Sequence, residues 1–189
     1  YLIFKYRNDV LKKINEIKFY GLLGGVVLSL SNICFILSMT STTVANTVFT
    51  ISLIPFLTAF FSFLILKEKL AKITIFTMLL AFGGVLVMFY GVLLIGALWG
   101  NILALFAAIC FSIFTIILRM NKSIDMLPCL LMSGVIAIAL SSFQKMGSLQ
   151  ISSNDFFLCF ILGAVLSGFV NCCFVFATRH LIAAEVTLF

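Results

Sequence analysis

Charged residues are scarce in this sequence. Only 10% of its 189 residues are charged, six of them acidic, while 63% are hydrophobic. A soluble domain carries about 25% charged residues, so this chain could not cover the surface of a water-soluble globule. A lipid bilayer accepts Leu, Ile, Val and Phe directly and requires no such cover. The composition therefore excludes a soluble fold and predicts a membrane protein.

The sequence also has little of what catalysis and metal binding require. It contains one histidine, His180, and neither an HExxH zinc motif nor a GxSxG nucleophile elbow. Its six cysteines lie inside apolar runs without CxxC spacing, which is typical of small buried hydrophobes. The formal charge of +6 comes from Lys and Arg scattered between apolar runs, not from a basic stripe with interleaved aromatics. We therefore expect no enzymatic activity, no metal, no cofactor and no nucleic-acid partner.

What the sequence does contain is a series of long apolar runs. A membrane-spanning helix needs about 20 mostly apolar residues. Six such runs are present, and a seventh begins near residue 182; the six cover residues 19–39, 43–66, 73–93, 100–118, 126–142 and 155–178. The alternation of a β-barrel is missing. We predict an all-α, multi-pass transmembrane bundle, and we interpret the chain, which starts in a helix tail and stops in an apolar run, as a fragment.

Basic residues alternate between the connecting loops. Residues 1–18 contain five Lys or Arg, residues 40–42 contain none, and three lysines follow at 67–72. The loop near Gly96 is uncharged, and Arg119 and Lys122 follow. The loop at 144–155 has one lysine, Lys145, balanced by Asp155, and Arg179 ends the series. Lys and Arg accumulate on the cytoplasmic side of short loops. We therefore predict that residues 1–18 are cytoplasmic, together with the loops at residues 67, 119 and 179, in a plasma (inner) membrane.

The first and sixth spans resemble each other. A shift of 139 residues aligns Leu23/Leu162, Gly24/Gly163, Val26/Val165, Asn32/Asn171, Cys34/Cys173, Phe35/Phe174 and Ala45/Ala184. The second copy comes five spans after the first, an odd number, so the copies would cross the membrane in opposite directions. We predict an inverted repeat, which places a substrate site near the bilayer midplane and supports alternating access.

Several segments carry a family resemblance. They are STTVANTVFTISLIP at 41–55, followed by FLILKEKL at 63–70, then FGGVLV at 82–87, WGNILALFAA at 99–108 and AAEVTL at 183–188. Their order and spacing resemble the EamA-type branch of the drug/metabolite transporter superfamily. The resemblance implies ten helices in two inverted five-helix units with both termini cytoplasmic. Residues 1–94 would then run from the end of helix two to helix five of the first unit, and residues 95–189 from helix six to the start of helix nine.

Amides within the spans are the first candidates for solute binding. Asn32 lies roughly 18 Å into its span, and Asn171 occupies the matched position of the second copy. The two side chains could line a central cavity, or they could hydrogen-bond between helices and contribute about 0.6 kcal/mol. Both interpretations remain open at this point.

The second span and the last segment supply the other candidates. Hydroxyls recur on one helical face at Thr43, Thr47, Thr50, Thr58 and Ser62. They could line a solute path, with Thr50 as a contact, or bond back to carbonyls four residues earlier and repair the helix near Pro55. Pro55 predicts a kink that could act as a gate hinge. Glu185 is either an interfacial carboxylate stabilised by the helix dipole or a substrate- or proton-binding group, and Asn46 is its counterpart in the repeat.

The function favoured by these features is that of a secondary transporter of a small metabolite or drug-like solute. Its expected partners are the small-molecule substrate and membrane lipid, and a homodimer stays open as its assembly. The alternatives are an intramembrane enzyme, for which no paired nucleophile and base is visible, and a non-transporting membrane scaffold, for which an inverted repeat would be a coincidence. Gly21 and Gly25 form a GxxxG pair, which favours close packing between helices.

Overall fold

A computed structural model gives the structure of the chain at residues 10–67, 75–76, 79–80, 82–84, 87, 98–122, 124–144, 153–180 and 187. The structured segments within these ranges are helical, and they contain no strand, which confirms the all-α prediction. The predicted span at 73–93 is described only at isolated positions. The run beginning near residue 182, including Glu185, lies outside the described residues.

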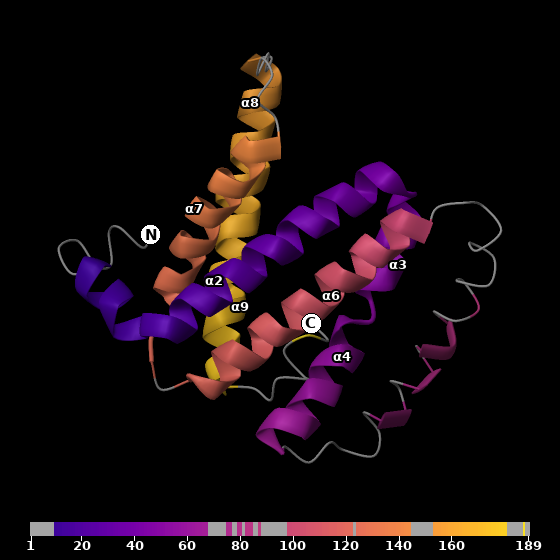
Figure 1. Cartoon of the computed structure of the whole chain (residues 1–189), viewed down its shortest axis with the longest axis horizontal. Coiled ribbons are helices and arrows are strands. Elements are labelled where there is room, and N and C mark those ends of the chain that lie inside the picture. Colours follow the sequence, from indigo (N-terminus) through magenta and orange to yellow (C-terminus); the bar gives the residue numbers. More distant parts are fainter. Residues whose placement is uncertain are drawn as a thin grey trace.

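Helices of membrane-spanning length account for four of the predicted runs. The apolar stretches are Phe19–Ser41, Val44–Leu66, Leu98–Met120 and Asn154–Thr178. The predicted run at 126–142 is also helical, but its apolar part, Leu127–Ser142, is shorter than the others. The helices are α2 (Val10–Ser41), α3 (Val44–Ile51), α4 (Ile54–Phe61), the π-helix η1 (Ser62–Leu66), α6 (Leu98–Met120), α7 (Leu127–Gln144), α8 (Ser153–Phe160), the π-helix η3 (Ile161–Ser167) and α9 (Gly168–His180) (Figure 1).

The predicted kink in the second span is confirmed as a break between α3 and α4. Helix α3 ends at Ile51, α4 begins at Ile54, and Pro55 occupies the first turn of α4. Proline has no N–H to donate to the carbonyl four residues earlier, so it is tolerated best at the start of a helix. The backbone N–H groups of Ser52 and Leu53 donate to Phe49 O at 3.2 Å and Thr50 O at 3.1 Å, which tightens this turn.

Helix α6 lies at the centre of the packing, and α2 runs antiparallel to it. The Ser31 hydroxyl donates to Ala107 O at 2.9 Å, and the Ser38 hydroxyl donates to Gly100 O at 2.7 Å. Moving forward along α2 therefore means moving backward along α6. The close contact of α2 with α7 occurs at Gly25, where an added Cβ would lie 3.2 Å from Met132 Cβ, as expected of the GxxxG pair.

The other two spans run in the same direction as α6. Thr42 lies against Gly100 at the start of α6, and further along the Ser112 hydroxyl donates to Ile54 O at 3.3 Å, so α3 and α4 are parallel to α6. At the far end, Arg119 Nη1 donates to Thr178 O at 3.2 Å, which brings the ends of α6 and α9 together. Helices α2 and α9 consequently run in opposite directions (Figure 1).

The hydrophobic core gathers where α2, α6, α7 and α9 meet. It contains Leu28, Phe114, Ile117, Leu118, Met126, Leu127, Cys129 and Val175. The rings of Phe111 and Phe174 join α6 to α9 with centroids 5.2 Å apart. The interpretation of the cysteines as buried hydrophobes holds for Cys34, Cys110 and Cys129, but Cys159 and Cys173 are exposed, because little of the α8–α9 segment is covered by other helices.

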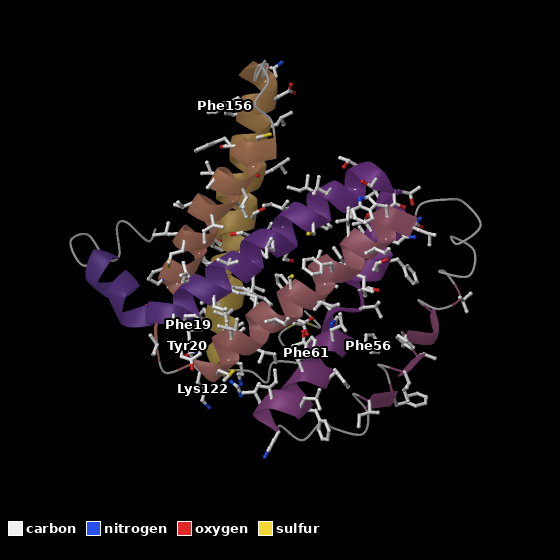
Figure 2. All side chains as sticks on the ribbon, viewed as in Figure 1. Phe19, Tyr20, Phe56, Phe61, Lys122 and Phe156 are labelled. Carbon is white, nitrogen blue, oxygen red and sulfur yellow. The ribbon has the colours of Figure 1, made fainter. Side chains whose placement is uncertain are left out.

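Figure 2 shows the two ends of the bundle through labelled side chains. Phe19, Tyr20 and Lys122 lie at one end, and Phe156 at the start of α8 lies at the other. Tyr20 and Lys122 are exposed. An aromatic pair beside a lysine is typical of the interface between hydrocarbon and headgroups.

Candidate functional site

The two predicted cavity amides occupy different environments. Asn32 is exposed, on a face of α2 that the neighbouring described helices leave open, whereas Ser29 and Ser31 beside it are buried. Asn171 is half-buried, and its Nδ2 donates to Ser167 O at 2.9 Å within its own helix. No hydrogen bond among the described residues joins the two amides. Their helices do run in opposite directions.

The start of α3 holds two further predicted residues in one local network. The Asn46 Nδ2 donates to Thr42 Oγ1 at 3.2 Å, and the Thr50 hydroxyl donates to Asn46 O at 2.8 Å. Thr43 caps the helix by accepting from Asn46 N at 3.2 Å. Thr50 is only 2% exposed, so in this conformation its hydroxyl is closed to solvent.

Four residues of the predicted hydroxyl stripe are buried, whereas the fifth, Thr43, is exposed at the start of α3. Thr47, Thr50, Thr58 and Ser62 are each 2% exposed or less, and this face packs on α6. Thr47 and Thr50 bond back to carbonyls four residues earlier, as the second interpretation required. Both bonds lie before Pro55 in the chain. They therefore do not replace the hydrogen bond that the Ile51 carbonyl loses because Pro55 has no N–H. In this conformation the stripe is a helix-packing surface and lines no open path.

Two residues of this region were missed by the sequence analysis. The Ser38 hydroxyl lies 2.8 Å from Thr47 Oγ1 in a hydrogen bond while it also bonds Gly100 O. Asn101, the fourth residue of α6, is 3% exposed, and its Oδ1 has no hydrogen-bond partner among the described residues. The signal that singled out Asn32, an amide in an apolar run, was also present at Asn101.

The polar groups of these spans are amides and hydroxyls. Residues 19–66 and 98–118 contain no Asp, Glu, Lys, Arg or His. Such groups can hydrogen-bond a neutral or zwitterionic solute, but they offer no general acid or base. Across the part of the chain that the structure describes, no three His, Cys, Asp or Glu side chains gather into a metal site. The remaining predicted residue, Glu185, lies outside that part.

Comparison with known proteins supplies one match. No curated protein and no solved structure matches the chain. Residues 1–90 match the model of the EamA-like transporter family, and this range contains α2, α3, α4 and the Pro55 break. The family resemblance found in the sequence is thus confirmed over residues 1–90, and this match indicates a membrane transporter of small solutes.

Proposed function

We propose that this chain forms part of a secondary carrier that moves a small metabolite or drug-like solute across a membrane by alternating access. The observation that carries the proposal is the match of residues 1–90 to a transporter family. The opposite directions of α2 and α9 support the alternating-access mechanism, because inverted copies of one unit can exchange conformations around a shared site.

The moving surface in this mechanism is the contact between two units. We assign residues 1–94 to the first unit and residues 95–189 to the second. Helices α2, α3 and α4 of the first unit pack on α6 of the second, partly through the hydrogen bonds of Ser31, Ser38 and Ser112. Each of these bonds has a backbone carbonyl as its acceptor, so a small shift along α6 could exchange one carbonyl for the next at low cost.

The solute site in this proposal faces the open side of α2. A carboxamide exposed to hydrocarbon would lose its hydrogen bonds at a cost of several kcal/mol, so the exposed Asn32 supports a polar cavity on that face. Asn171 would line the matched wall of the second unit. Asn46, Thr50 and Glu185 complete the candidate contacts, with Glu185 as the one carboxylate able to bind a proton or a cationic group.

The break before Pro55 is the proposed gate hinge. It divides the second span into α3 and α4, each eight residues long. A short helix joined to the next by a two-residue turn can tilt with a change in few backbone angles. Tilting of α3 would open the buried face that includes Thr47 and Thr50, and α4 could stay packed on α6.

The proposed membrane orientation follows from the charged loops. The ends of α2, α6 and α9 that meet near Phe19, Arg119 and Thr178 would face the cytoplasm, in the plasma (inner) membrane. Single cysteines at Lys67 and Lys145, labelled from one side in intact cells, should react on opposite sides. Labelling of both from the same side would contradict this orientation.

Uptake into liposomes tests the transport proposal. The full-length protein, reconstituted, should take up one or more members of a panel of radiolabelled neutral L-amino acids and nucleosides, with and without a proton gradient. A double variant, Asn32→Leu with Asn171→Leu, should lose most of this uptake with protein levels intact, while Asn121→Leu serves as the matched control. The Asn121 amide, in the turn after α6, donates to Ile117 O at 2.9 Å and is not one of the proposed solute contacts. Unchanged uptake by the double variant would remove the cavity role of both amides.

A further inference from the structure

An unsatisfied amide is buried where α3 meets the start of α6. Asn101 is 3% exposed, and its Oδ1 has no partner among the described residues. Leaving a buried acceptor unpaired costs about 1–3 kcal/mol, and such atoms are uncommon in folded proteins. A carboxamide kept at this cost calls for a partner that this conformation does not supply.

Neighbouring contacts fix the position of Asn101. Gly100, the residue before it, lies so close to Thr42 that an added Cβ would be 2.6 Å from Thr42 Cβ. Further along, the bond from Ser112 to Ile54 O keeps α3 and α4 parallel to α6. Asn101 therefore lies level with the first turns of α3, which is seen beside the start of α6 in Figure 1.

Several polar groups of this neighbourhood hydrogen-bond to partners other than Asn101. Ser38 donates to Gly100 O, Thr50 donates to Asn46 O, and Asn46 Nδ2 donates to Thr42 Oγ1. The hydroxyl of Thr47 bonds Ser38 and Thr43 O. None of the described groups donates to Asn101 Oδ1 in this conformation, which leaves this oxygen free to accept from a bound molecule.

We propose that Asn101 is a solute-binding residue whose Oδ1 accepts a hydrogen bond from an N–H or O–H group of the transported solute. Access requires α3 to move away from α6, which the break at Ser52 and Leu53 allows, because it uncouples α3 from α4. This inference rests on the proposed transport function and adds the chemistry of recognition: the solute must present a donor at the end of the bundle opposite Arg119.

The test compares solutes and variants in liposomes that contain the full-length protein. The probes are L-alanine and its N,N,N-trimethyl derivative, which keeps the carboxylate but has no N–H. Asn101→Leu should raise KM for L-alanine about tenfold, and it should narrow the wild-type preference for L-alanine over the trimethyl compound. Asn121→Leu, which alters a hydrogen-bonded amide in the turn after α6, should change neither quantity.

Stability separates binding from a structural role. Replacing an unsatisfied polar group by an apolar one of similar size is neutral or stabilising, so the resistance of Asn101→Leu to unfolding should equal or exceed that of the wild type. If the wild type takes up L-alanine and Asn101→Leu has the same KM, this inference is overturned and the transport function stands. The same holds if Asn101→Leu unfolds more easily than the wild type. Absence of L-alanine uptake by the wild type would overturn the inference, and absence of uptake of every panel solute would overturn the proposed function as well.

Discussion

Replacing Gly100 by Ala probes the contact on which the arrangement of α2, α3 and α6 depends. The added Cβ would lie 2.6 Å from Thr42 Cβ, 2.8 Å from Thr42 Cγ2 and 2.9 Å from the backbone carbon of Ser41. Real Cβ atoms do not approach other atoms this closely, and the backbone of α2 cannot rotate away as a flexible side chain would. Helices α2 and α6 would have to separate, which also lengthens the 2.7 Å bond from Ser38 to Gly100 O.

The expected loss follows from two opposing terms. Overpacking a close contact costs about 1–3 kcal/mol, and exchanging Gly for Ala in a helix returns at most about 1 kcal/mol. Since Gly100 lies in the first turn of α6, where the helix gain is small, we expect a net loss of about 1–2 kcal/mol. Unfolding of the purified full-length protein in mixed micelles, titrated with SDS, measures this difference.

A matched glycine supplies the control. Gly134 lies in α7 with nothing within 4 Å of an added Cβ, so Gly134→Ala should be neutral or stabilising by up to about 1 kcal/mol. Adding Thr42→Gly to Gly100→Ala removes two of the three close atoms and should recover part of the loss. Equal stability of Gly100→Ala and Gly134→Ala would refute the close approach of these helices.

Three further substitutions test other contacts. Ser29→Ala should cost about 0.6 kcal/mol in the same titration, because the hydroxyl joins α2 to α7 through a 2.7 Å hydrogen bond; an unchanged midpoint would contradict that bond. Arg119→Gln should lower stability by about 1 kcal/mol, since the guanidinium donates to Thr178 O at the end of α9, and Arg119→Lys should retain part of the effect. Pro55→Ala should make α3 and α4 one continuous helix and leave the free energy of unfolding unchanged or higher. It should lower the turnover of uptake severalfold, and an unchanged turnover would contradict the hinge role of the break.

Composition and chain chemistry were sufficient to predict most of the fold. Apolar length decides where a helix can span a bilayer, and the missing N–H of Pro55 places the break in the second span within a few residues. The extension of α2 back to Val10 was not predicted, because only apolar residues were used to delimit the span. The segment at 10–18 is rich in good helix formers such as Lys and Glu, so helix propensity allows the extension.

The environment of the candidate site could not be predicted in the same way. Helical periodicity placed Thr47, Thr50 and Thr58 on one face, but periodicity does not say what covers that face. The covering helix, α6, lies about fifty residues further along the chain, and its packing position depends on small residues such as Gly100 and Ala104, which is 0% exposed. The same limit hid Asn101, whose amide becomes informative only once its burial and its lack of a partner are known.

Loop charges and helix contacts address topology independently. Two packed helices can be parallel or antiparallel whatever the charges of their loops, so hydrogen bonds between helices carry separate information. The contacts place the end of η1, at Leu66, and the start of α6, at Leu98, at opposite ends of the bundle, because α3 and α4 are parallel to α6. The two ends of the intervening segment therefore lie at opposite ends of the bundle, as a span predicted at 73–93 requires. Among the described residues, Lys67 at the end of η1 and Arg119 lie at the end of the bundle where α6 meets α9, whereas the uncharged turn at 40–42 lies at the opposite end, where Gly100 meets Thr42.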